Sequence, residues 1–159
     1  TRCCSSAASD VYKRQLHDDD HPEPDFLLDF ATLTGAARIA LGTECPALFC
    51  NLAQTACDMM DLGKDVDDPV WQLPLFDAYD RYLDSGQAGL SSTGNAGGYG
   101  GAITAALFLR RFIGKQVNWA HIDVMAWNLS ARPGRPKGGE AMGLRTSFAY
   151  IKQLAKAGQ

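Results

Sequence analysis

Two hydroxyls, one apolar side chain and a glycine stand together at Thr32, Leu33, Thr34 and Gly35. They follow residues 26–30, a short apolar run with the length of a buried strand and one charged interruption. Glycine permits the tight turn that would lead from this strand into a helix. Ligands of open α/β sheets gather at such strand ends, so the turn is predicted to offer backbone groups to a ligand. A strand-to-helix connection that binds nothing is the simpler alternative.

His121 and Asp123 form a second candidate, because alternation places both on one face of a predicted strand. A histidine beside a carboxylate suits acid–base chemistry. The hydroxyls that might serve as a nucleophile are Ser91, Ser92 and Ser130, and none has an evident geometric match to the pair. Structural hydrogen bonding by His121 and Asp123 is therefore the favoured interpretation.

The first 24 residues contain a possible metal cluster and an anomalous start. Residues 16–24, LHDDDHPEP, place His17 and His21 around three aspartates. Prolines at 22 and 24 oppose a shared helix face, so a solvated linker is favoured over a metal site. Residues 1–15 have no initiator Met and no signal-peptide core, and they resemble translated vector sequence. We expect them to be a non-native leader.

Glycine is concentrated in residues 85–101, just before a predicted helix over residues 102–112. A glycine-rich loop entering a helix can hold an anion with its backbone N–H groups. An anion-binding α/β protein that uses residues 94–101 is thus an alternative function. A nucleotide-binding P-loop would need a lysine at the helix start, and residues 101–104 contain none.

The remaining elements are read from hydrophobic periodicity and breakers. The pattern predicts a helical stretch over 36–41, a strand over 47–50, a helix from 52 to the Asp67-Asp68-Pro69 stop, a loop and helix ending near 83, and a strand over 119–126. An amphipathic helix over 141–156 closes the chain. The residues on its apolar face are Leu144, Phe148, Ile151, Leu154 and Ala155.

Several blocks follow one another in a characteristic order. They are PDFLLDFATLTGA with ALG (24–42), PALFCN (46–51), VWQLPL (70–75), GGAITAALFLRRF (100–112) and NWAHIDVMAWN (118–128). Together they resemble the leucyl aminopeptidase (cytosolic aminopeptidase) family. The ending SARPGRPKGGEAMGLR (130–145) is most similar to a bacterial subgroup. The resemblance covers about residues 24–155.

The resemblance implies a hydrolase that removes N-terminal residues from peptides with two divalent cations, zinc or manganese. It implies a cytoplasmic homo-hexamer. The implied fold is an α/β three-layer sandwich with a mixed central sheet of about three strands, incomplete in this chain. The residues implied to border the substrate are Thr32, Leu33, Thr34, Gly35, Met125 and Ala126.

No counterpart of the family's catalytic and metal-binding residues is found. The Asn-Thr-Asp-Ala-Glu-Gly-Arg motif expected before the turn is absent, and the glutamates are Glu23, Glu44 and Glu140. Residues 25–157 are therefore expected to be the C-terminal part of a catalytic domain, inactive alone. Residues 88–92 also depart from the family pattern. A non-catalytic paralogue acting as an oligomerisation module is a further alternative.

The composition of the chain argues against several classes of binding partner. A net charge of −3 and a pI near 5.5 argue against a nucleic-acid footprint, and no apolar stretch has membrane-spanning length. The five cysteines form neither a disulfide framework nor a Cys-x-x-Cys zinc pair. Free thiols in a reducing cytoplasm are the expected state.

Overall fold

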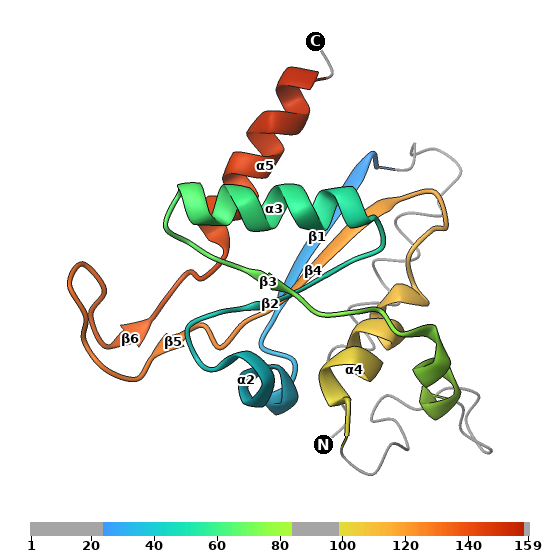
Figure 1. Ribbon diagram of the computed structural model, residues 1–159, viewed down its shortest axis with the longest axis horizontal. Coiled ribbons are helices and arrows are strands. Elements are labelled where there is room, and N and C mark those ends of the chain that lie inside the picture. The colour runs from blue at the N-terminus through green and yellow to red at the C-terminus, as the bar shows by residue number, and fades with distance from the viewer. Residues whose placement is uncertain (1–23, 84–98, 158–159) are drawn as a thin grey trace.

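A four-stranded sheet lies at the centre of the molecule, with helices on both faces (Figure 1). The computed structural model describes residues 24–83 and 99–157. The strands are β1 (Phe26–Ala31), β2 (Ala47–Cys50), β3 (Trp71–Gln72) and β4 (Asn118–Asp123), in the order β1-β4-β2-β3. β1 is parallel to β4 and β2 is parallel to β3, whereas β2 and β4 are antiparallel. The predicted α/β fold with a mixed central sheet is confirmed.

One face of the sheet is covered by α3 (Ala53–Asp65) and α5 (Leu144–Ala157). Leu48 of β2 and Ile122 of β4 are fully buried there against Met59 of α3, in the largest core cluster. Spacing of three to four residues predicted α3, and the interdigitation of its buried face with the sheet supplies most of its stability.

The other face is covered by α2 (Gly35–Leu41), α4 (Gly101–Arg110) and the 3₁₀ helix η1 (Asp77–Leu83). Phe49 of β2 and Trp119 of β4 are fully buried on this side. Alternate β4 residues thus face two separate cores, as the sequence alternation predicted.

Two predicted elements need correction. The strand expected over 119–126 ends at Asp123, because the chain turns at Ala126 into β5 (Trp127–Asn128). β5 pairs with β6 (Gly138–Gly139) in a short ribbon that the sequence did not indicate. The helix expected near residues 76–83 is the 3₁₀ helix η1.

Helix α5 forms where the spacing predicted, but a different face packs inward. Thr146, Ser147 and Tyr150 are buried, while Leu144 and Phe148 expose 56% and 64% of their surface. The apolar spacing alone therefore indicated the wrong face of this helix.

The buried polar face of α5 is accommodated because each hydroxyl has a partner. Thr146 donates to the backbone carbonyl of Asp68, and the Tyr150 hydroxyl lies 3.1 Å from the Thr55 hydroxyl on α3. A Cβ at Gly63 would lie 3.1 Å from both the Asp68 carbonyl and the Thr146 hydroxyl, so the close approach of α3 requires glycine. Buried polar groups with partners carry little net cost.

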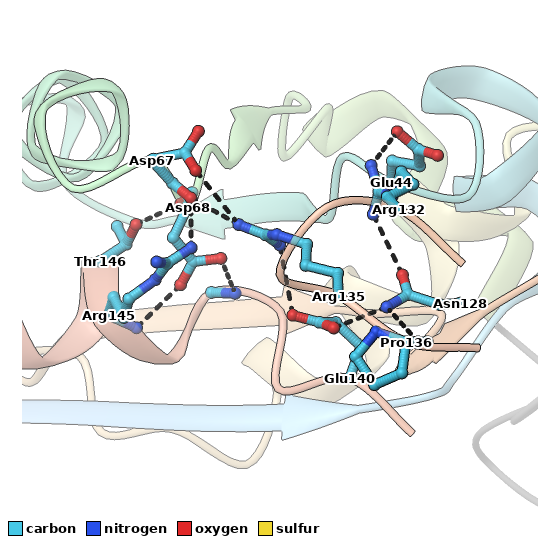
Figure 2. Close-up of polar contacts among 11 residues, drawn as sticks. Glu44, Asp67, Asp68, Asn128, Arg132, Arg135, Pro136, Glu140, Arg145 and Thr146 are labelled. Carbon is cyan, nitrogen blue, oxygen red and sulfur yellow. Dashed lines mark hydrogen bonds and ion pairs between the residues drawn. The ribbon is translucent and has the colours of Figure 1, made fainter. Parts of the chain in front are cut away.

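Asp68 fixes the start of α5 (Figure 2). Its side chain accepts hydrogen bonds from the backbone N–H groups of Gly143, at 2.9 Å, and Arg145, at 2.8 Å. The residue is 3% exposed. N–H groups at a helix start have no partner within the helix, so a distant carboxylate here replaces a local cap. The sequence had identified Asp68 only as part of the stop after α3.

Some predictions lie outside the described residues. These are the leader, the linker with His17 and His21, and most of the glycine-rich loop, of which only residues 99–101 are described. Cys45, Cys50 and Cys57, the cysteines within the described ranges, are free thiols as expected. No helix among the described residues is long and apolar enough to cross a membrane.

Candidate substrate-binding site

The two segments predicted to border a substrate meet at one edge of the sheet. β1 and β4 run parallel with Ala31 opposite Asp123, and the Val124 N–H donates to the Ala31 carbonyl at 2.9 Å. The chain therefore leaves both strands side by side, placing residues 32–35 beside residues 125 and 126. Such an edge is where ligands of α/β sheets gather.

The turn after β1 is held by one buried carboxylate. Asp123, 4% exposed, accepts from the N–H groups of Leu33 at 3.0 Å and Thr34 at 3.3 Å, and from the Thr34 hydroxyl at 2.6 Å. Three donors on one carboxylate fix the backbone of the turn before any ligand arrives. The predicted structural role of Asp123 is confirmed.

Thr34 also begins the helix that follows. Its backbone is extended, with φ −131° and ψ 142°, and its hydroxyl accepts from the Ala37 N–H at 3.1 Å. This is the geometry of an N-cap residue. Thr34 thus couples the start of α2 to Asp123.

The internal bonds engage only some of the backbone groups of the turn. The Leu33 N–H is taken by Asp123, so it cannot donate to a substrate. Among the described residues, neither the Leu33 carbonyl nor the Gly35 N–H has a hydrogen-bond partner. The turn can therefore offer the Leu33 carbonyl as an acceptor and the Gly35 N–H as a donor to a ligand.

His121 does not pair with Asp123, although both lie on the same face of β4. Its Nδ1 lies 2.5 Å from a carboxylate oxygen of Asp29 on β1, and Trp119 Nε1 donates to the other oxygen at 2.7 Å. The ring is 1% exposed and lies between Trp119 and Phe49. Burial excludes His121 from contact with a substrate, and its predicted structural role is confirmed.

Ala126 occupies a backbone conformation that side chains disfavour. Its φ is +55°, in the left-handed region, which costs a non-glycine residue about 1 kcal/mol. Its carbonyl accepts from the Glu140 N–H at 3.1 Å, next to the β5–β6 pairing. Strain held in place by the surrounding structure is common where a chain shapes a binding site.

A polar network pins the ribbon that follows Ala126 (Figure 2). Asn128 on β5 donates to Glu140 at 2.6 Å and accepts from Arg132 at 3.0 Å, and Arg132 pairs with Glu44 in the loop before β2. Arg135 extends the network by pairing with Glu140 at 3.2 Å. The ribbon is thereby tied to the body of the sheet.

Sequence reasoning missed one neighbour of the site. The Arg38 side chain on α2 donates from its Nη1 to the thioether of Met125 at 3.4 Å. The signal was available in part, since Arg38 lies one helical turn after Gly35. Its contact with Met125, 87 positions away, required the strand pairing to be known.

No metal centre is formed by the residues that the structure describes, since no group of three or more His, Cys, Asp or Glu side chains lies close enough to hold an ion. The carboxylates nearest the turn, Asp29 and Asp123, are occupied by the internal hydrogen bonds given above. The donor set of the described site does not suit a dinuclear metal centre.

Comparisons with known proteins agree with this geometry. Residues 14–148 match the cytosol aminopeptidase family, catalytic domain. A probable cytosol aminopeptidase of Nitratidesulfovibrio vulgaris is 41% identical over 133 residues, covering 82% of this chain and 26% of the relative. One from Dechloromonas aromatica is 45% identical over 114 residues, covering 70% of this chain and 22% of the relative.

Solved structures give the same result. The cytosol aminopeptidase from Coxiella burnetii is 49% identical with a TM-score of 0.82, covering 92% of this chain and 31% of that one. The bottromycin maturation enzyme BotP in complex with Mn is 32% identical with a TM-score of 0.84, covering 93% of this chain and 32% of that one. The chain spans roughly a quarter of the length of its curated relatives, and it belongs to the cytosol aminopeptidase family, matching part of the catalytic domain.

Proposed function

We propose that this chain is the substrate-positioning part of a metal-dependent aminopeptidase that hydrolyses N-terminal residues from peptides. The observation that carries the proposal is the turn held by Asp123, in which the Leu33 carbonyl and the Gly35 N–H have no partner among the described residues. A peptide backbone laid along the turn would satisfy both groups. Thr32 and Thr34 shape the turn, and Met125 and Ala126 border the substrate's N-terminal side chain.

Two divalent cations, zinc or manganese, supply Lewis acidity and an activated water in this family's chemistry. The donor set of the described residues does not fit two metals. We therefore assign no metal-dependent step of the reaction to residues 24–83 or 99–157. The contribution of these residues is orientation, which places the scissile bond before reaction. A cytoplasmic homo-hexamer is proposed on the family resemblance.

Substitutions at Gly35 test the backbone contact. Gly35→Pro deletes the N–H at the first helical residue, where proline fits, and the extended backbone of Thr34 suits a residue before proline. A Cβ at Gly35 meets only the Arg38 side chain at 3.5 Å, so Gly35→Ala is a matched control that keeps the N–H.

The readout is leucine amide binding to the chain with ¹³C-methyl-labelled methionine, followed at Met125. Gly35→Pro is expected to weaken binding by about three- to tenfold, the value of one lost hydrogen bond, and Gly35→Ala to leave it near wild type. Equal affinities for both variants would contradict the backbone contact. The absence of any shift at Met125 would contradict the location of the site.

An activity assay tests whether this chain lacks a working metal centre. Incubated with leucine amide and Mn²⁺ or Zn²⁺, this chain is expected to give no turnover above the metal blank. Metal-dependent turnover abolished by a chelator would show that the chain holds a working metal centre. The oligomerisation-module and anion-binding alternatives are not favoured by any contact among the described residues.

A further inference from the structure

The Arg38 side chain reaches back from α2 over the turn. Its Nη1 contacts the Met125 thioether at 3.4 Å, and its Nη2 lies 3.5 Å from the position that a Cβ on Gly35 would occupy. The guanidinium therefore lies between Gly35 and Met125, which come from the two segments that border the proposed peptide site.

The charge of Arg38 is not neutralised within the described part of the chain, where no carboxylate lies within 4.0 Å of it. Several other arginines there are paired with carboxylates, among them Arg110 with Asp77 at 2.7 Å and Arg135 with Glu140 at 3.2 Å. A thioether is a weak acceptor, so most of the donor capacity of Arg38 is unused.

Asp123 does not serve as the missing partner, because its carboxylate accepts from the turn and forms no ion pair with Arg38 among the described residues. A guanidinium presents a planar fork of donors that matches a carboxylate with two parallel hydrogen bonds. A peptide lying on the turn would bring its own carboxylates within reach of this fork.

We propose that Arg38 is a specificity-determining residue that favours peptides with a carboxylate close to the N-terminus, an inference that rests on the proposed function. The carboxylate can belong to the first side chain, the second side chain or the C-terminus of a dipeptide. Each source gives the same chemistry, a bidentate contact to an exposed arginine.

Three matched pairs of dipeptides separate these sources by methyl NMR titration at Met125. Glu-Leu-amide against Gln-Leu-amide tests the first side chain. Leu-Glu-amide against Leu-Gln-amide tests the second, and Leu-Leu against Leu-Leu-amide tests the C-terminus. The charged member of at least one pair is expected to bind about two- to fivefold more tightly, as for an exposed charge-assisted pair, with the ratio falling as salt is added.

Variants assign the preference to the residue. Arg38→Gln is expected to reduce the affinity ratio of that pair to one while Leu-Leu-amide still binds. Arg38→Lys keeps the charge without the fork and should retain only part of the ratio. Arg81→Gln, an exposed arginine on η1 that contacts Tyr82, is the matched control and should leave every ratio unchanged.

The outcomes separate this inference from the proposed function. If the neutral dipeptides bind and each charged member binds equally, or if the ratio survives Arg38→Gln, the specificity role is wrong and the peptide site stands. If no dipeptide shifts Met125, both are wrong. A change limited to thermal stability in Arg38→Gln would mean that Arg38 only stabilises the end of α2.

Discussion

Asp68 and Asp123 perform the same task on opposite faces of the sheet. Each carboxylate is nearly fully buried, 3% and 4% exposed, and each accepts two backbone N–H groups from a distant segment. Asp68 bonds to residues 75 and 77 positions away, and Asp123 to residues 90 and 89 positions away. In both cases one side chain fixes a chain segment that local sequence does not fix.

The two carboxylates differ in the access of water to the groups they hold. The Gly143 N–H bonded to Asp68 is buried, whereas the bonds of Asp123 are partly buried at a turn whose Thr32 and Gly35 are exposed. Water can replace a lost partner at the turn and cannot at Gly143. We infer that Asp68 mainly raises the free energy of unfolding, whereas Asp123 mainly fixes the conformation of the turn at the candidate site.

Asp68→Ala is expected to have the largest effect on stability. It leaves the buried N–H of Gly143 and the N–H of Arg145 without an acceptor, and it lowers the free energy of unfolding by about 3 kcal/mol. Urea denaturation followed by circular dichroism measures the change. A loss below about 1 kcal/mol would mean that water reaches this site and would remove the difference between the two carboxylates.

The reactivity of the Cys50 thiol measures loosening of the sheet face that is covered by α3 and α5. It lies in the core cluster shared by α3 and α5, and burial raises the pKa of its thiol to about 12, so at pH 8 almost none is thiolate. Cys57 is exposed and should react with a thiol reagent before Cys50 in the wild type. Asp68→Ala should accelerate labelling of Cys50 under native conditions, and Asp123→Ala should not.

Asp123→Ala is expected to lower the free energy of unfolding by about 2 kcal/mol, less than Asp68→Ala because water can solvate the released N–H groups. The free energy of leucine amide binding should fall by a larger fraction than the free energy of unfolding, since the turn loses its fixed shape. Asp123→Asn retains one acceptor oxygen, so its stability and its affinity should lie between those of the wild type and those of Asp123→Ala. Lost stability with unchanged binding would assign Asp123 to stability alone.

Thr34→Ala tests the link between Asp123 and α2. Loss of the cap and of the hydroxyl bond to Asp123 should cost about 1 kcal/mol in thermal or urea unfolding. Thr34→Ser, which keeps the hydroxyl, is the matched control and should remain close to wild type. Equal losses in both variants would point to packing of the threonine methyl group.

Glu44→Gln is expected to have the smallest effect. The Glu44 side chain is 60% exposed and that of Arg132 is 31% exposed, so this ion pair should contribute under about 0.5 kcal/mol at moderate salt. Unfolding at low and high salt measures it. A loss comparable to that of Asp123→Ala would show that the ribbon network is cooperative.

Periodicity predicted the elements that contain enough residues to show it. Helix α3 and the alternating faces of β4 followed from spacing of three to four or two residues, and the strands β1 and β2 from short apolar runs. β3, β5 and β6 contain two residues each, too few for any periodicity, and they were missed. Apolar spacing located α5 but gave the wrong buried face, because its inward hydroxyls find partners on α3 and at Asp68.

The candidate site was predictable where chemistry is local. The turn, its glycine and the capping threonine lie within four consecutive residues, and two buried polar residues on a strand indicated structural hydrogen bonds. The roles of Arg38 and Asp68 depend on partners at least 75 positions away, so no local pattern could indicate them. Which backbone groups of the turn stay free also depended on those long-range bonds.

The strand order has a consequence for how this chain folds during synthesis. β1 and β2 are successive along the chain but are separated in the sheet by β4. Asp29 cannot form its contact with His121 until the ribosome has added 92 more residues. At ordinary ribosomal speeds of 5–20 residues per second that interval is about 5–20 s. Throughout it, two apolar strands have unpaired edges, which invites aggregation and makes folding slow. Chaperone binding to nascent chains should therefore end only after β4 has emerged.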